Sequence, residues 1–321
     1  MKMRSRLHGI VALAAVSLAA THCRRAKRAS AAAASENPLA AASPQAVASS
    51  SFVLIPAGEF IMGDTLDGDQ NAPPHRVYVS EFYLQKTEVS KAEWDSVRTW
   101  AASHGYPDLA EGAGKAADHP VEVVSWWDTV KWCNARSEQE ELNPCYTVDG
   151  AVMRSGTTEP SVNWTATGYR LPTEAEWEKA ARGGLSGKRF PWGDTISHSQ
   201  ANFTNHGGET YQTGTSGIHP IAGAGSRPFT SPVGSFPANG YGLYDMAGNL
   251  WEWGWDLKGG DLTHPQTDPR GASSGTKRVI RGGAWDCYAE GTRCACRRHF
   301  EPGPAVGGIG FRPARSSVPK Q

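Results

Sequence analysis

The chain has 321 residues, and its 32 lysines and arginines balance its 32 aspartates and glutamates. A chain without net charge has no global electrostatic attraction for nucleic acid, so that class of partner is excluded as a general function. The 36 glycines and 12 tryptophans indicate a loop-rich fold in which aromatic side chains anchor the core.

The N-terminus predicts an export signal over residues 1–23. Basic residues come first, and the apolar stretch over residues 7–20 is too short for a good transmembrane helix. Cys23 follows directly, as in a lipoprotein signal, but His22 occupies a position where a small residue is expected. Lipidation of Cys23 and ordinary secretion therefore remain two alternatives. Either predicts an exported bacterial protein, periplasmic or membrane-anchored, in a compartment where disulfides form.

The rest of the chain divides into a tether, one domain and a short tail. Residues 31–51 are almost all alanine, serine and proline, which offer too little apolar surface to offset the entropy of ordering. With the short basic run before them they form a predicted disordered tether over residues 24–51. We expect one domain over residues 52–315 and a tail over residues 316–321.

Strands are expected first and helices next. Residues 52–63 are typical of two short strands around a Pro-Ala-Gly turn, and residues 75–79 and 82–84 continue the sheet. Three helix starts then share a capping pattern, in which a side-chain oxygen satisfies an otherwise unpaired amide and is worth about 1 kcal/mol. The three pairs, each three residues apart, are Ser90 with Glu93, Ser125 with Asp128 and Thr173 with Glu176.

The most distinctive stretch lies near the C-terminus. Val279 and Ile280 read as a buried strand, and the Gly282-Gly283 pair permits a bend that other residues resist. Three cysteines then fall within ten residues, namely Cys287, Cys294 and Cys296. Thiol chemistry, metal binding and a local disulfide are the alternatives that these residues leave open.

Several motifs, in order along the chain, resemble one known family. They are GYRLPTEAEWE at 168–178, FPWGD at 190–194, SPVG at 231–234, NGYGLYDMAGNLWEW at 239–253 and GFR at 310–312. With the opening stretch, they are similar to the formylglycine-generating enzyme family, the sulfatase-modifying-factor domain. The resemblance implies an α+β fold, a single domain of the formylglycine-generating-enzyme type with a C-type-lectin-like core and little regular secondary structure.

The resemblance also implies an oxidase site. In the enzymes of the family two cysteines, five residues apart, hold copper(I) and use oxygen to convert a sulfatase cysteine to formylglycine. The first corresponds to Cys287, but Thr292 stands five residues later and Ala284 replaces a serine. Copper(I) prefers thiolates, so one thiolate with a threonine is a poor site. The candidate catalytic residues are Cys287, which would keep its role as copper ligand, and the displaced Cys294 and Cys296.

The cysteine pairing stays open. The resemblance places Cys294 on a structural cysteine of the family whose usual partner position holds Ala180 or Ala181 here. The hypotheses for the cluster are a Cys287–Cys294 or a Cys287–Cys296 pair, as a disulfide or a metal site. A separate pair is predicted for the two remaining cysteines of the domain, Cys133 and Cys145, which leaves one cysteine over.

Calcium is the other metal that the resemblance implies. One site of the family corresponds to carboxylates and carbonyls of Asp245, Gly248, Leu250 and Glu252, and such hard oxygen ligands suit the ion. The alternative is that Asp245 caps a turn and Glu252 pairs with an arginine. The acidic residue of a second site is replaced by Gly223 to Ser226, which leaves only Asn202 and Phe203.

Two tryptophans and three arginines complete the candidates. Trp251 and Trp285 correspond to the groove that holds a peptide in the enzymes, and core packing explains them equally well. Arginines at this end of the chain either neutralise an anionic ligand or pair with acids inside the domain. We expect internal pairing for Arg297, Arg298 and Arg312.

Three functions follow from these residues. The first is an exported divergent oxidase with an altered copper–thiolate site. The second is a non-catalytic binding or scaffold module of the cell envelope, built on the lectin-like core. The third is true formylglycine generation on sulfatases. The expected partner is a sulfatase-like polypeptide or another envelope protein, and membrane contact is expected only through a lipid anchor on Cys23.

Overall fold

The structure is a computed structural model that describes residues 51–68, 71–259 and 263–317. The predicted export signal, Cys23 and nearly all of the predicted tether lie outside these residues, as does most of the tail. Within the described ranges, no helix is long and apolar enough to cross a membrane. The described part covers the predicted domain of residues 52–315 apart from two short gaps.

The described residues form three α-helices, each starting after its predicted cap: α2 (Lys91–Ala102), α3 (Trp126–Gln139) and α4 (Glu174–Ala181). The Ser90 hydroxyl accepts a hydrogen bond from the Glu93 amide. Ser125 and Thr173 each form a complete capping box, in which the acid three residues later accepts from the amide of the cap. The three predicted helix starts are therefore confirmed.

Most strands are short, and two 3-10 turns, η1 (Leu66–Gly68) and η2 (Ala289–Thr292), lie among them. The strands are β1 (Phe52–Ile55), β2 (Gly58–Met62), β3 (His75–Val79), β4 (Phe82–Gln85), β5 (Tyr146–Val148), β6 (Ala151–Val152), β7 (Ser161–Val162), β8 (Tyr169–Arg170), β9 (Thr204–Asn205), β10 (Gly217–Ile218), β11 (Trp251–Leu257), β12 (Gln266–Thr267), β13 (Arg278–Arg281), β14 (Arg298–Phe300), β15 (Ile309–Gly310) and β16 (Ala314–Ser316). The mixed content, with few helices, agrees with the predicted α+β class.

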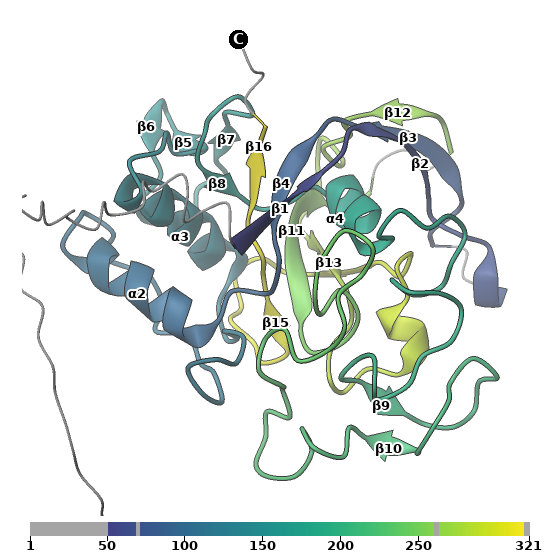
Figure 1. The fold of residues 1–321 in the computed structure, drawn as a ribbon. Coiled ribbons are helices and arrows are strands. Elements are labelled where there is room, and N and C mark those ends of the chain that lie inside the picture. The colour runs from purple at the N-terminus through teal and green to yellow at the C-terminus, as the bar shows by residue number, and fades with distance from the viewer. Residues whose placement is uncertain (1–50, 69–70, 260–262, 318–321) are drawn as a thin grey trace, which may run out of the picture. The chain divides into compact units, whose positions relative to one another are not determined.

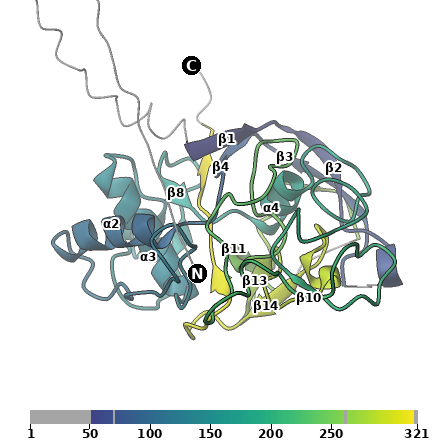
Figure 2. The same cartoon turned by 60° about the horizontal axis from the view of Figure 1, so that its bottom comes forward.

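Two four-stranded sheets bring distant parts of the chain together. In the first, with the order β1-β4-β16-β8, the first and last strands of the domain both pair with β4. In the second, with the order β14-β13-β11-β15, only β15 runs parallel to its neighbour. Figure 1 and Figure 2 show α2 and α3 on one side of β4 and α4 on the other. α4 packs against β2, β3, β11 and β13.

Tryptophans fill the core between α2, α3 and the sheets. The rings of Trp94 and Trp132 stack with centroids 6.0 Å apart, and the Phe311 ring meets both edge-on. All three side chains are fully buried. The abundance of tryptophan therefore serves packing in a domain with little regular structure, as the composition predicts.

A buried charge network fixes α4 to the strands around it. The Glu178 carboxylate accepts from Arg182, from Arg281 of β13 and from the Gly63 amide. Burial alone raises the pKa of Glu178, but the two guanidinium groups outweigh it and lower that pKa. Removing one partner of a buried ion pair leaves an uncompensated charge, so these contacts make the position of α4 specific.

A second buried acid lies at the start of α4. The Asp256 carboxylate, on β11, accepts from the Glu174 amide at 2.8 Å. Burial raises the pKa of Asp256 to about 8, and repulsion from the Glu174 carboxylate adds to the rise. Glu174 is itself held by Arg297. Folding therefore keeps a proton on Asp256 over a pH range in which the unfolded chain has lost it.

This difference predicts how Asp256→Asn changes stability with pH. An unfolded aspartate ionises near pH 3.9, whereas the folded one holds its proton to about pH 8. The free energy of unfolding of the native protein therefore decreases as the pH rises between those two values. Asparagine keeps an oxygen for the Glu174 amide without ionising. In urea unfolding the variant should match the native protein near pH 4 and exceed it by a few kcal/mol near pH 9. A difference that stays constant with pH would contradict this assignment.

Candidate functional site

The predicted thiol site lies in the loop that follows β13. Gly282 and Gly283 turn the chain with φ of 93° and 77°. A Cβ on Gly283 would lie 2.7 Å from the Thr292 methyl carbon and 2.8 Å from the Gly291 carbonyl oxygen. Only glycine allows the loop to fold back onto η2 in this way. The return brings Gly291 beside the Cys287 side chain.

Cys287 is half-buried, whereas the other four cysteines of the described ranges are buried. Burial raises the pKa of the Cys287 thiol to about 11, although hydrogen bonds from the Ala284 backbone and the Trp251 side chain oppose the rise. Cys296 lies close enough for its charge to raise the same pKa. A thiol with this pKa is almost fully protonated at neutral pH, so it is a weak nucleophile.

Thr292 occupies the position five residues after Cys287. Its side chain is fully buried, and its hydroxyl donates to the Ala289 carbonyl at 2.9 Å. Ala284 is also buried and brings no polar side-chain atom to the loop. At the position where the family has its second copper ligand, this chain therefore has a hydroxyl that is already hydrogen-bonded within η2.

Cys294 and Cys296 have different surroundings. Cys294 belongs to an apolar cluster that includes Ala180 and Ala181 of α4, where the resemblance expects the missing partner. Burial raises the pKa of Cys294 to about 12. The backbone carbonyls of both cysteines accept from the Arg281 guanidinium. Cys294 is thus a core residue, and Cys296 is the cysteine that lies near Cys287.

No disulfide joins the five cysteines that the structure describes. Cys133 and Cys145 lie in one buried cluster, and each keeps its thiol. Burial raises the pKa of both, and the charge of Cys145 raises that of Cys133 further. The predicted pairings of Cys133 with Cys145, and of Cys287 with Cys294 or Cys296, are therefore absent from this structure.

These contacts do not fit a copper site with two thiolates. Thr292 offers no sulfur, and Cys294 belongs to the apolar core. Within the described ranges, no group of three or more histidine, cysteine, aspartate or glutamate side chains is arranged to hold a metal ion. We therefore derive no chemical step through copper.

Three acids meet inside the domain around one arginine. Arg312 makes a two-pronged ion pair with Glu252, at 2.6 and 2.7 Å, and donates to the Asp245 carbonyl. Burial, then repulsion from Asp245 and Glu252, raises the pKa of Glu88 well above its usual value. Burial also raises the pKa of Asp245 to about 6, although the Gly234 amide and Arg312 oppose the rise. One guanidinium thus faces three carboxyl groups.

The predicted calcium ligands are only partly available. Both Glu252 oxygens are engaged, one by Arg312 alone and the other by Arg312 and the Trp177 indole. Asp245 Oδ1 is buried and has no hydrogen-bond partner among the described residues. Of the set Asp245, Gly248, Leu250 and Glu252, the structure thus leaves one Asp245 oxygen open and engages both Glu252 oxygens, and a calcium site there stays a prediction. The alternative, a pairing of Glu252 with an arginine, is the one observed.

The remaining calcium candidates serve packing and support. Phe203 is fully buried in an apolar cluster. Asn202 donates to the Phe229 carbonyl and to the Asn249 side chain, and its own Oδ1 is buried without a partner in the described part of the chain. Of the three arginines expected to pair internally, Arg297 and Arg312 do so, with Glu174 and Glu252.

Five residues of this loop and its neighbours are treated together as the Cys287 cluster: Trp251, Trp285, Cys287, Tyr288 and Arg227. Trp251 contacts the thiol, and Tyr288 is 49% exposed. The Arg227 guanidinium lies 5.6 Å from the centroid of the buried Trp285 ring. Sequence analysis did not identify Arg227 because nothing in the local sequence pattern indicates that it lies beside Trp285. Glu88 was missed for the same reason, since its partners lie about 160 residues away.

Three features together characterise this class of domain. It has few helices, its core is packed with tryptophans, and a loop that carries cysteines begins at a pair of glycines. The family model described as "Sulfatase-modifying factor enzyme 1-like domain" matches residues 37–317. The chain belongs to this family, as the motifs predict.

Three known proteins are similar to this chain. The chain is 33% identical to the formylglycine-generating enzyme of Mus musculus over 300 residues, which cover 86% of this chain and 78% of the enzyme. It is 30% identical to the "Inactive C-alpha-formylglycine-generating enzyme 2" of the same species, over 83% of this chain and 86% of that protein. Among solved structures, Treponema denticola variable protein 1 aligns with a TM-score of 0.64 at 30% identity, covering 83% of this chain and 95% of its own.

The thiol environments predict the order of alkylation. Iodoacetamide at pH 8 should label Cys287 first, roughly a hundredfold more slowly than a free cysteine, because few thiolates form when the pKa is about 11. Trp251→Phe should slow labelling further, since it removes a hydrogen bond that lowers this pKa. Peptide mass spectrometry under native and unfolding conditions measures both. Labelling of Cys287 only after reduction would reveal a disulfide that this structure lacks.

The ion pair of Glu252 predicts the response to calcium. Because Arg312 occupies both Glu252 oxygens, millimolar calcium chloride should leave the Tm of the purified protein unchanged, measured against magnesium chloride at equal ionic strength. A ligand that binds only the folded state would raise Tm. A calcium-dependent rise that Asp245→Asn abolishes would contradict this expectation and support the site that the resemblance implies.

Proposed function

We propose that this protein is an exported member of its family that does not generate formylglycine and instead binds a polypeptide partner at the cell envelope. One observation carries the proposal: Thr292, five residues after Cys287, commits its buried hydroxyl to Ala289. The loop then offers one half-exposed thiol instead of a thiolate pair. The similarity to a mouse protein named as inactive supports the view that the fold persists without the activity.

The Cys287 cluster is the surface proposed to bind. Aromatic residues and arginine are enriched where protein interfaces bind most strongly, and this cluster supplies both kinds. Tyr288 is exposed, and the His206 ring meets it edge-on at 4.5 Å. Arg227 is also exposed and lies over the Trp285 and Phe229 rings. A polypeptide with an acidic residue beside an apolar one suits this arrangement.

Export follows from the N-terminal sequence and is part of the proposal. A basic start, an apolar stretch and Cys23 support a location of the domain outside the cytoplasm, either lipid-anchored or secreted. In this proposal the predicted tether over residues 24–51 would link the domain to the site of attachment. The proposed partner is a sulfatase-like polypeptide or another envelope protein.

A divergent oxidase is the second candidate, and one observation favours it. Cys287 is the half-exposed thiol of the cluster, and Cys296 lies close enough to influence its pKa. If these two sulfurs replaced the pair of thiolates that lie five residues apart in the enzymes of the family, copper(I) would have two soft ligands. The buried position of Cys296 argues against this exchange, since it is only 2% exposed.

One comparison of variants separates these candidates. The native protein is expected to bind no copper(I) against a competing chelator and to form no aldehyde on a sulfatase-motif peptide in air. Thr292→Cys, which restores a thiol five residues after Cys287, should bind one copper(I) per chain. Cys287→Ser in that background should abolish the gain, and Cys294→Ser should not. Competition titrations with copper(I) and aldehyde trapping provide the measurements.

The opposite result is equally informative. Aldehyde that forms with the native chain and vanishes with Cys287→Ser would establish an oxidase and overturn the proposal. Loss of that activity with Cys296→Ser as well would assign the second ligand to Cys296.

A further inference from the structure

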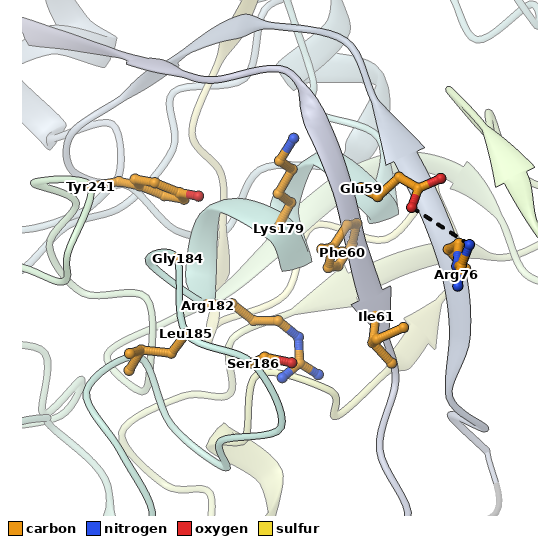
Figure 3. A pocket seen from close by; sticks show the side chains of 10 residues that line it. All are labelled: Glu59, Phe60, Ile61, Arg76, Lys179, Arg182, Gly184, Leu185, Ser186 and Tyr241. Atoms are coloured by element: carbon orange, nitrogen blue, oxygen red, sulfur yellow. Dashed lines mark ion pairs between the residues drawn. The ribbon is translucent and has the colours of Figure 1, made fainter.

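A cavity of about 350 Å³ opens between β2 and the C-terminal end of α4. This volume lies within the range of sites that bind small ligands. Figure 3 shows Lys179 of α4 and Arg182, the residue that follows this helix, between Tyr241 on one side and Phe60 and Ile61 of β2 on the other. None of its lining residues belongs to the Cys287 cluster, so the cavity is a separate feature of the domain.

Part of the cavity wall is apolar and open to solvent, beside the charged and polar side chains of the lining. Ile61 is 43% exposed and Leu185 is 40% exposed, and the two lie on opposite sides of the view in Figure 3. Phe60 and Tyr241 add two half-buried rings. Exposed apolar side chains that converge on a hollow mark a binding site more often than scattered ones do.

A lysine without a counter-charge lines the same cavity. Lys179 is only 4% exposed, and its Nζ donates to the Gly58 and Val79 carbonyls at 2.9 and 3.2 Å. An ammonium group has three donors, so one N–H remains. Within the described ranges, no carboxylate lies within ion-pair distance of Nζ. Burial lowers the pKa of Lys179, and only the charge of Asp268 opposes the fall.

The other charges of the lining are already paired. Arg182 donates to the Glu178 carboxylate and to the Gly63 and Lys188 carbonyls. At the outer edge, Arg76 and Glu59 form a loose pair at 3.8 Å, with both side chains exposed. Lys179 is therefore the cation of the cavity lining that has no ion pair among the described residues and one unused N–H donor, and an anion would satisfy both.

We propose that this cavity binds a small carboxylate with an apolar chain. The carboxylate accepts the remaining N–H of Lys179 and supplies its missing counter-charge. The chain of the ligand lies against Phe60, Ile61 and Leu185. A single available donor favours a compact anionic group over a large one with many oxygens. The apolar part of the wall favours a hydrocarbon tail over a polar one.

The hydrocarbon walls predict a dependence on chain length. Each buried methylene contributes about 0.8 kcal/mol, which is about fourfold in affinity. Isothermal titration of the purified full chain with butanoate, hexanoate and octanoate should therefore show an affinity that rises by roughly that factor per methylene until the cavity is filled. Octan-1-ol, which has the chain without the charge, should bind at least about tenfold more weakly than octanoate.

Two variants test the contacts separately. Lys179→Met should reduce octanoate affinity at least about tenfold, because it removes the charge. Leu185→Glu places a carboxylate on the rim of the cavity and should weaken octanoate binding through repulsion. This second variant alters a side chain that is already 40% exposed, so it keeps the test valid if Lys179→Met fails to fold. The matched control is Leu54→Glu, at 42% exposure outside the cavity, which should bind octanoate as the native chain does.

Three results would overturn the proposal. The first is no heat of binding for octanoate at millimolar concentration. The second is equal affinity for octanoate and octan-1-ol, which would make the site merely apolar. The third is an equal loss of affinity in Leu185→Glu and Leu54→Glu, which would mean that binding is not confined to this cavity. None of these measurements involves Cys287, so they are independent of the function proposed above.

Discussion

The structure depends most on the buried contact between Glu178 of α4 and Arg281 of β13. The same guanidinium that meets this carboxylate also donates to the backbone carbonyls of Cys294, Ala295 and Cys296. One side chain thus ties a helix, a strand and the cysteine segment together. Its charge is kept in the interior because the carboxylate and three carbonyls replace the lost water.

This constraint explains why the cysteine loop has little freedom to rearrange. Arg281 stands directly before the Gly282-Gly283 bend, so the loop leaves from a fixed point. It returns through η2 against Gly283, where no larger residue fits. The carbonyls held by Arg281 then fix the segment that carries Cys294 and Cys296. A sequence change at one position, such as Thr292, therefore alters the chemistry of the loop without disturbing its course.

Local patterns in the sequence predict much of the fold, but they do not predict contacts between residues far apart in the chain. The helix starts at Ser90, Ser125 and Thr173 could be predicted because a cap and its partner lie three residues apart. The family motifs located the loop of Cys287 in the same way. Sequence analysis placed Glu252 among calcium ligands, yet it could not choose between a metal and an arginine. That choice depends on Arg312, which lies sixty residues further on and reaches Glu252 only in the folded chain.

The pairing of β1 and β16 with the same strand, β4, has a consequence for how the protein is made. The last strand of the domain lies between β4 and β8, so the first sheet stays open until residues 314–316 are available. Strand pairs so far apart in sequence form late, because the loop between them must close first. During synthesis the sheet cannot be completed until nearly the whole chain has left the ribosome.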